Sequence, residues 1–168
     1  MNFGGFMKKL CLCVLLLTGQ LSAYASTDTE LNQLKQQVFR PLAPMIRTNV
    51  NQLKQHDFEW QIGTNGGVRV LHGYKIENHT ISEADFTRID RQINGFFKRK
   101  GWQSDYNQQA DGPGMGQFGF YNQRFVCLVD FSANEIELIN DVEEILQQDT
   151  SNWTYHYQIA CGAKPATP

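Results

Sequence analysis

The sequence contains only one long apolar run, Leu10–Thr18, and no second one follows it. That run is about half of the roughly 20 residues that a helix needs to cross a bilayer, which argues against a membrane-spanning segment. Lys8 and Lys9 precede the run, and the small-x-small sequence Ala23-Tyr24-Ala25 follows it. This order is typical of a cleavable secretory signal. We therefore expect residues 1–25 to be removed and the product to be periplasmic or extracellular.

The chain also has little excess charge. Removing 25 of the 168 residues leaves 143, with 13 basic against 17 acidic residues and a net charge of −4. A weakly acidic chain lacks the basic footprint of nucleic-acid or anionic-lipid binding, so we expect neither partner. The size fits one domain, which we assign to residues 26–163, followed by a flexible tail at 164–168.

Cysteine is scarce. Of the four cysteines, Cys11 and Cys13 lie inside the signal, which leaves Cys127 and Cys161. A lipoprotein would need a cysteine just after the apolar run, so lipidation is not expected. Two cysteines in an oxidising compartment usually pair, and the sequence predicts a Cys127–Cys161 disulfide. Two buried free thiols are the alternative.

Motifs for catalysis or cofactor binding are missing. No serine sits on a glycine-flanked elbow, and the glycines from Gly112 to Gly119 match neither phosphate-binding pattern. The four histidines, His56, His72, His79 and His156, show no metal-binding spacing such as H-E-x-x-H. We therefore assign no catalytic, cofactor-binding or metal-binding residue and expect no cofactor.

Hydrophobic periodicity predicts the secondary structure. Leu31, Leu34 and Val38 recur at helical spacing, which predicts a helix over 28–39. After Pro41 and Pro44 the spacing resumes, which predicts a second helical piece to about Gln55. The other expected elements, in chain order, are a hairpin from 58 to 74, a helix over 83–100 ending at Gly101, a strand at 102–106, a loop at 108–114, strands around 118–120 and 125–131, a helix within 134–148, and a strand over 153–160.

Residues 125–131 are apolar on both faces, so this strand should lie centrally in its sheet. Segregated strands and helices predict an α+β domain. We expect an antiparallel sheet of about five or six strands, with helices packed mainly on one face and one disulfide. Cys127 shares a face with Val129, and Cys161 shares one with Ile159. Both sulfurs should therefore point into the same core.

These observations favour a secreted, non-enzymatic binding protein, such as an inhibitor or immunity-type protein that acts on a protein partner in the cell envelope. Its contact surface is predicted to include Tyr106, Gly112, Gly114 and Tyr121, because aromatic residues anchor many interfaces. One alternative is an envelope hydrolase that uses His156 or His72 with an acid. Another is a structural accessory protein of the envelope.

Overall fold

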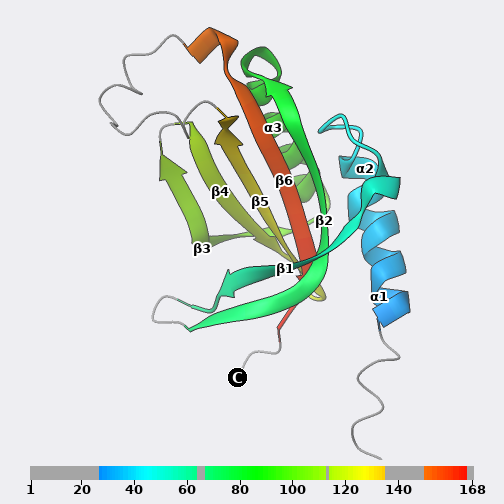
Figure 1. Cartoon of the computed structure of the whole chain (residues 1–168). Helices are drawn as coiled ribbons and strands as arrows, with labels where there is room; N and C mark the ends of the chain where they lie inside the picture. The colour runs from blue at the N-terminus through cyan, green and yellow to red at the C-terminus, as the bar shows by residue number, and fades with distance from the viewer. Residues whose placement is uncertain (1–26, 64–66, 113, 135–149, 166–168) are drawn as a thin grey trace, which may run out of the picture.

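Six strands form one antiparallel sheet in the order β1-β2-β6-β5-β4-β3, and the helices pack against one of its faces (Figure 1). The structure is a computed structural model that describes residues 27–63, 67–112, 114–134 and 150–165. The predicted α+β class, the antiparallel sheet and its five or six strands are confirmed.

The elements follow one another as α1 (Thr27–Leu34), the π-helix η1 (Lys35–Phe39), α2 (Arg40–Leu42), the 3₁₀ turn η2 (Val50–Gln52), β1 (Lys54–Gln61), β2 (Val68–Ser82), α3 (Glu83–Arg99), β3 (Gln103–Gly112), β4 (Met115–Tyr121), β5 (Phe125–Ala133), the 3₁₀ turn η4 (Thr150–Asn152) and β6 (Thr154–Ala163).

The N-terminal helix runs through Pro41 rather than ending before it. The wide π-helical turn η1 comes immediately before this proline, which stands in the first turn of α2. Proline has no N–H to donate, so a locally widened turn accommodates it at little cost. The buried side chains Val38, Phe39 and Leu42 keep this stretch against the sheet.

The predicted second helical piece to Gln55 is wrong. The chain leaves the helix at Leu42, and β1 already begins at Lys54. Between them, Arg47 adopts a positive φ of 55°, and the Asn49 side chain accepts a hydrogen bond from the Asn51 N–H at 2.9 Å. Such an Asx turn competes with the helical backbone pattern and redirects the chain.

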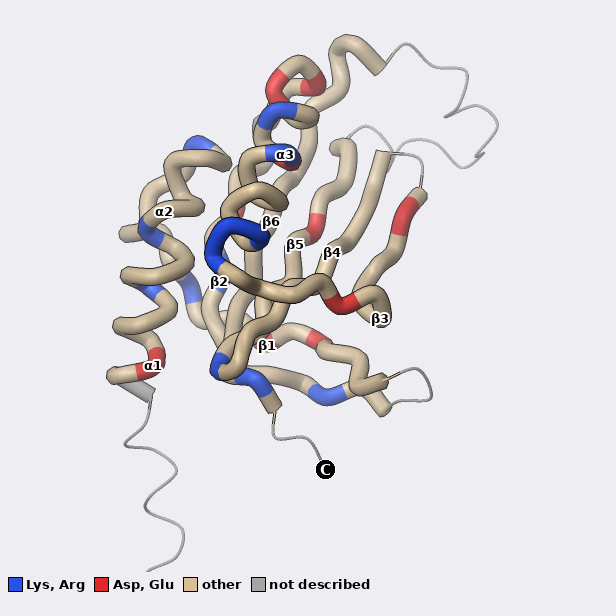
Figure 2. The backbone as a smooth tube through the Cα atoms, turned by 180° about the vertical axis from the view of Figure 1, so that it is seen from behind, with Lys and Arg blue, Asp and Glu red and all other residues tan. Residues whose placement is uncertain are grey.

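The helix predicted at 83–100 is confirmed as α3. Its apolar stripe buries Ile89, Ile93, Phe96 and Phe97. Gly101 follows with a φ of +73°, the left-handed conformation that ends many helices. The cationic end of α3, which is blue in Figure 2, complements the negative end of the helix dipole.

We call the side of the sheet that packs against the helices the covered face. Tyr155, Tyr157, Ile159 and Cys161 alternate onto it from β6, and all four are buried. Cys161 lies directly opposite Cys127 of β5, and the two form the predicted disulfide. Strand β5 is paired on both sides, with β4 and β6, as its apolar sequence predicts.

The loop predicted at 108–114 is wrong. Strand β3 continues to Gly112, which pairs with Met115 at the start of β4, although the pairing of the two strands is irregular between Asp105 and Ala110. Glycines here make room for neighbouring side chains. A Cβ on Gly116 would lie 2.5 Å from the nearest atom of the Phe131 ring. Apart from Asn134, the predicted helix within 134–148 lies outside the described residues.

The opposite side of the sheet, which we call the open face, is covered over only part of its length. The β1–β2 hairpin curls over it and packs Phe58 and Trp60 on Val126, Leu128 and Ala160. In Figure 1 this hairpin sweeps across beneath the other strands.

The side chain of Gln108 links the two edge strands of the curled sheet. The Gln108 amide of β3 accepts a hydrogen bond from the Gln61 N–H of β1 at 3.1 Å and donates one to its carbonyl at 2.7 Å. The two edge strands are thereby brought together although they stand at opposite ends of the strand order. The open face consequently becomes the concave side of the sheet.

Candidate functional site

The residues predicted to bind a partner do not form one surface. Tyr106 is 81% exposed on β3. Tyr121 ends β4, where the Lys164 ammonium lies 4.6 Å from the centre of its ring. Gly112 and Gly114 flank the β3–β4 turn at the other end of β4. The structure thus separates Tyr121 from the glycines that were expected to accompany it.

A groove lies on the open face, beyond the part that the hairpin covers. Its main cavity has a volume of about 400 Å³, and a second of about 360 Å³ under the hairpin shares its floor. Gln117, Asp130 and Gln158 line both cavities. We call the two together the open-face groove; its further lining includes Asp111, Met115, Ser132 and His156. The strands place these polar side chains by simple alternation, because Cys127, Val129 and Phe131 of β5 point the other way.

Asp130 is the most unusual group in the groove. Its only hydrogen bond among the described residues is a long one, 3.3 Å from the Gln158 amide nitrogen. Burial raises the pKa of Asp130 to about 6, and the Gln158 hydrogen bond offsets only part of this effect. Near neutral pH the groove floor therefore holds a carboxylate with unused acceptor capacity.

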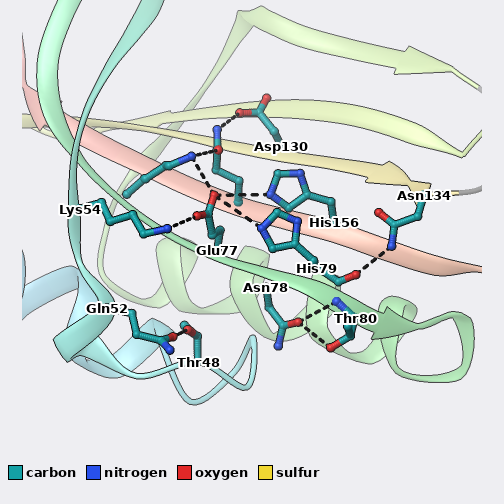
Figure 3. A network of polar contacts seen from close by, with 12 residues as sticks. Thr48, Gln52, Lys54, Glu77, Asn78, His79, Thr80, Asp130, Asn134 and His156 are labelled. Carbon is teal, nitrogen blue, oxygen red and sulfur yellow. Dashed lines mark hydrogen bonds and ion pairs between the residues drawn. The ribbon is translucent and has the colours of Figure 1, made fainter. Parts of the chain in front are cut away.

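A chain of polar contacts leads away from Asp130 along the open face (Figure 3). The Lys75 ammonium donates to the side-chain amide oxygen of Gln158 at 3.1 Å and pairs with a Glu77 carboxylate oxygen at 2.7 Å. Lys54 pairs with the other Glu77 oxygen at 2.8 Å. Hydrogen bonds from Lys54 and Lys75 lower the pKa of Glu77 to about 2, so this carboxylate stays ionised throughout the physiological range.

Two histidines complete the open face beside Glu77. The rings of His79 and His156 stack with their centroids 4.1 Å apart and their planes 8° from parallel. Burial and the neighbouring His79 lower the pKa of His156. The lowered pKa favours the uncharged form of His156, which suits stacked rings because two adjacent imidazolium cations would repel each other.

Comparison with known proteins does not identify the groove or the histidine pair. The chain matches no protein-family model, no curated protein and no solved structure. None of the described helices combines the length and apolar character that crossing a bilayer requires. Any assignment of function therefore depends on the chemistry of the residues themselves.

The alternation pattern could have identified the groove. Asp130 interrupts the most apolar strand of the sequence. Burying an ionisable residue in a central strand costs free energy, so its presence there suggests a functional role. His156 and Gln158 alternate with the buried Tyr155, Tyr157 and Ile159. What the sequence did not show is that the hairpin leaves this end of the open face uncovered.

Proposed function

We propose that the protein works outside the cytoplasm as a non-enzymatic binding protein, and that a protein partner of the cell envelope docks in the open-face groove. The observation that carries this proposal is the Asp130 carboxylate, which lies on the groove floor and receives a single long hydrogen bond from the described residues. Asp130 is half-buried, and a carboxylate that has lost part of its hydration in a concave site favours an external hydrogen-bond donor. The signal-like N-terminal segment and the disulfide support the location.

The lining of the groove indicates the chemistry of the partner. Asp130 and Asp111 supply negative charge, while Gln117 and Gln158 supply amides. An arginine presents a planar fork of donors that matches a carboxylate and neighbouring amide oxygens, and it is enriched at interface anchors. We therefore expect the partner to insert a segment that carries an arginine, or a lysine as a weaker substitute.

Site-specific photo-cross-linking tests this proposal. Met115 is 45% exposed and lines the groove, so a photoreactive amino acid in its place should form one discrete adduct with an envelope protein. Lys100, an exposed residue at the end of α3, is the control position and should give no adduct. Mass spectrometry identifies the captured partner.

Three results would contradict docking in the groove. The first is no adduct from the photoreactive amino acid at position 115, and the second is equal adducts from positions 115 and 100. The third is an adduct only when the photoreactive amino acid replaces Tyr106. The last would move the contact to the edge of β3, where the sequence placed part of it.

One observation supports the alternative of an envelope hydrolase: each of the two histidines considered for it lies near an acidic side chain. His72 Nδ1 lies 2.8 Å from Asp57, and His156 Nε2 lies 3.7 Å from Glu77. The His72 pair stands in open water, with side chains 86% and 59% exposed, and lacks the desolvated setting of a general base. His156 lies in the groove beside Ser132, its partner across the strands, and is the better candidate.

A further inference from the structure

Three potential metal ligands converge on the open face at the end of the polar chain. Glu77 and His79 are two residues apart on β2, and His156 projects from the neighbouring strand β6. The pairing of β2 with β6 is interrupted between Asn78 and Ile81. In this interruption the Asn78 side chain accepts hydrogen bonds from the Thr80 N–H at 2.8 Å and hydroxyl at 3.0 Å, which fixes the backbone that carries His79.

The donor atoms of these residues lie close together and point toward one carboxylate. His156 Nε2 lies 3.7 Å and His79 Nε2 lies 4.0 Å from the same Glu77 oxygen, and all three donors fall within 4.8 Å of one another (Figure 3). His156 Nε2 is buried and has no hydrogen-bond partner in the part of the chain that the structure describes. A buried nitrogen without a partner costs free energy and therefore calls for an explanation.

We propose that Glu77, His79 and His156 bind a divalent transition-metal ion, with Zn²⁺ the best match. Two imidazoles and one carboxylate are the protein ligands of many three-ligand zinc sites, in which a fourth position stays open. Bonds of about 2.0–2.1 Å to a tetrahedral ion place its donors roughly 3.3 Å apart. The donor distances to Glu77 exceed this by less than 1 Å, and tilting the two rings so that both Nε2 atoms move toward the Glu77 oxygen would shorten them.

The surroundings of the three ligands both favour and oppose the ion. Lys75 holds the oxygen that faces the histidines, as an outer-shell partner of a carboxylate ligand would. Lys54 and Lys75 nevertheless repel a cation, so we expect binding weaker than at a dedicated structural zinc site.

The site adjoins the groove through His156, which belongs to both. An ion bound there would present its open coordination position to a donor in the groove. The metal proposal does not depend on a protein partner, because its three ligands all come from this chain. Failure of the cross-linking experiment would leave it standing, and failure of metal binding would leave the docking proposal standing.

Calorimetric titration of Zn²⁺ into the tag-free, disulfide-bonded protein at pH 7.5 tests the proposal. We expect one ion per chain. Removing a ligand should weaken binding at least about tenfold in His79→Gln and in His156→Gln. His72→Gln should match the wild type because His72 lies on a different surface, 2.8 Å from Asp57. Lys54→Gln should tighten binding up to about fivefold, because it removes a competing cation that is 63% exposed.

Nuclear magnetic resonance of the wild-type protein provides a second test that does not depend on the variants folding correctly. Among the four histidines, the ring signals of His79 and His156 should respond to stoichiometric Zn²⁺ while that of His72 does not. The proposal is overturned by any of three results: no binding at millimolar Zn²⁺, unchanged affinity in both ligand variants, or a response of His72 in place of the pair.

Discussion

Replacing Cys127 and Cys161 with alanine is expected to lower the free energy of unfolding by about 4 kcal/mol, through loss of a cross-link that closes a loop of about 35 residues. The two cysteines are 34 positions apart, and both are fully buried in the main core. They join two neighbouring strands, one of which is the most apolar strand of the sheet. A loss of this size is a large fraction of the 5–15 kcal/mol that typically separates folded from unfolded domains.

Urea denaturation of the oxidised wild type, the reduced wild type and the double variant measures this effect. Reduction should bring the wild type close to the stability of the double variant, whereas reductant should leave the double variant unchanged. Equal midpoints for oxidised and reduced wild type would show that the bridge contributes little.

Gly73→Ala is expected to destabilise the protein by about 3 kcal/mol, at the upper end of typical overpacking costs. A Cβ at this position would lie 2.9 Å from the Cys161 carbonyl carbon and 2.9 Å from the Phe58 ring, and it would also collide with the Cys161 carbonyl oxygen. Backbone atoms paired across the sheet cannot yield as a flexible side chain would. The hairpin must therefore lift away from the open face and expose Trp60, which is only 4% exposed in the native fold.

Gly67→Ala is the matched control, because no atom of the described residues lies within 4 Å of a Cβ there. Thermal unfolding measures the loss of stability, and hydrogen exchange of the β1 amides reports whether the hairpin has opened. If the two alanine variants had equal stability, the close packing of the hairpin would not be the constraint that shapes the groove.

Local sequence patterns predicted most of the fold because alternation and helical spacing report directly which side of an element is buried. Residues 83–100 and 153–160 show such patterns clearly, and both elements form as expected. The patterns failed where tertiary contacts dominate. A loop was predicted at 108–114, yet residues 108–112 belong to β3. In the neighbouring strand β4, Gly116 and Gly119 each lie beneath a side chain from another strand, Phe131 and Gln108 respectively.

The candidate site was less predictable for the same reason. The alternation in the sequence placed His156 and Gln158 on the same face of their strand. Glu77 and His79 join them on that face only through the pairing of β2 with β6. That pairing connects segments about 80 residues apart. The uncovered end of the open face depends on how far the hairpin curls, and Gly73, Gly119 and the Gln108 hydrogen bonds determine this.

Asp130→Asn is expected to stabilise the protein at pH 7.5 by about 1–2 kcal/mol. Burial raises the pKa of Asp130 from 3.8 to about 6, so the folded protein binds this proton more tightly than the unfolded chain. The stability that the protonated form contributes is complete below pH 4 and is lost as the pH rises through 6. Two pKa units correspond to about 3 kcal/mol, and partial exposure in the groove reduces this value. The gain should vanish below pH 4.

A carboxylate that costs stability is expected where it serves binding, since functional groups often occupy unfavourable environments. The most direct test is the affinity of the Asp130→Asn protein for the partner captured from position 115, measured at pH 7.5. Asp57→Asn, which changes an exposed carboxylate outside the groove, is the control. Docking in the open-face groove predicts that Asp130→Asn binds at least about tenfold more weakly while the control binds as the wild type does. Unchanged affinity in a more stable Asp130→Asn protein would contradict it.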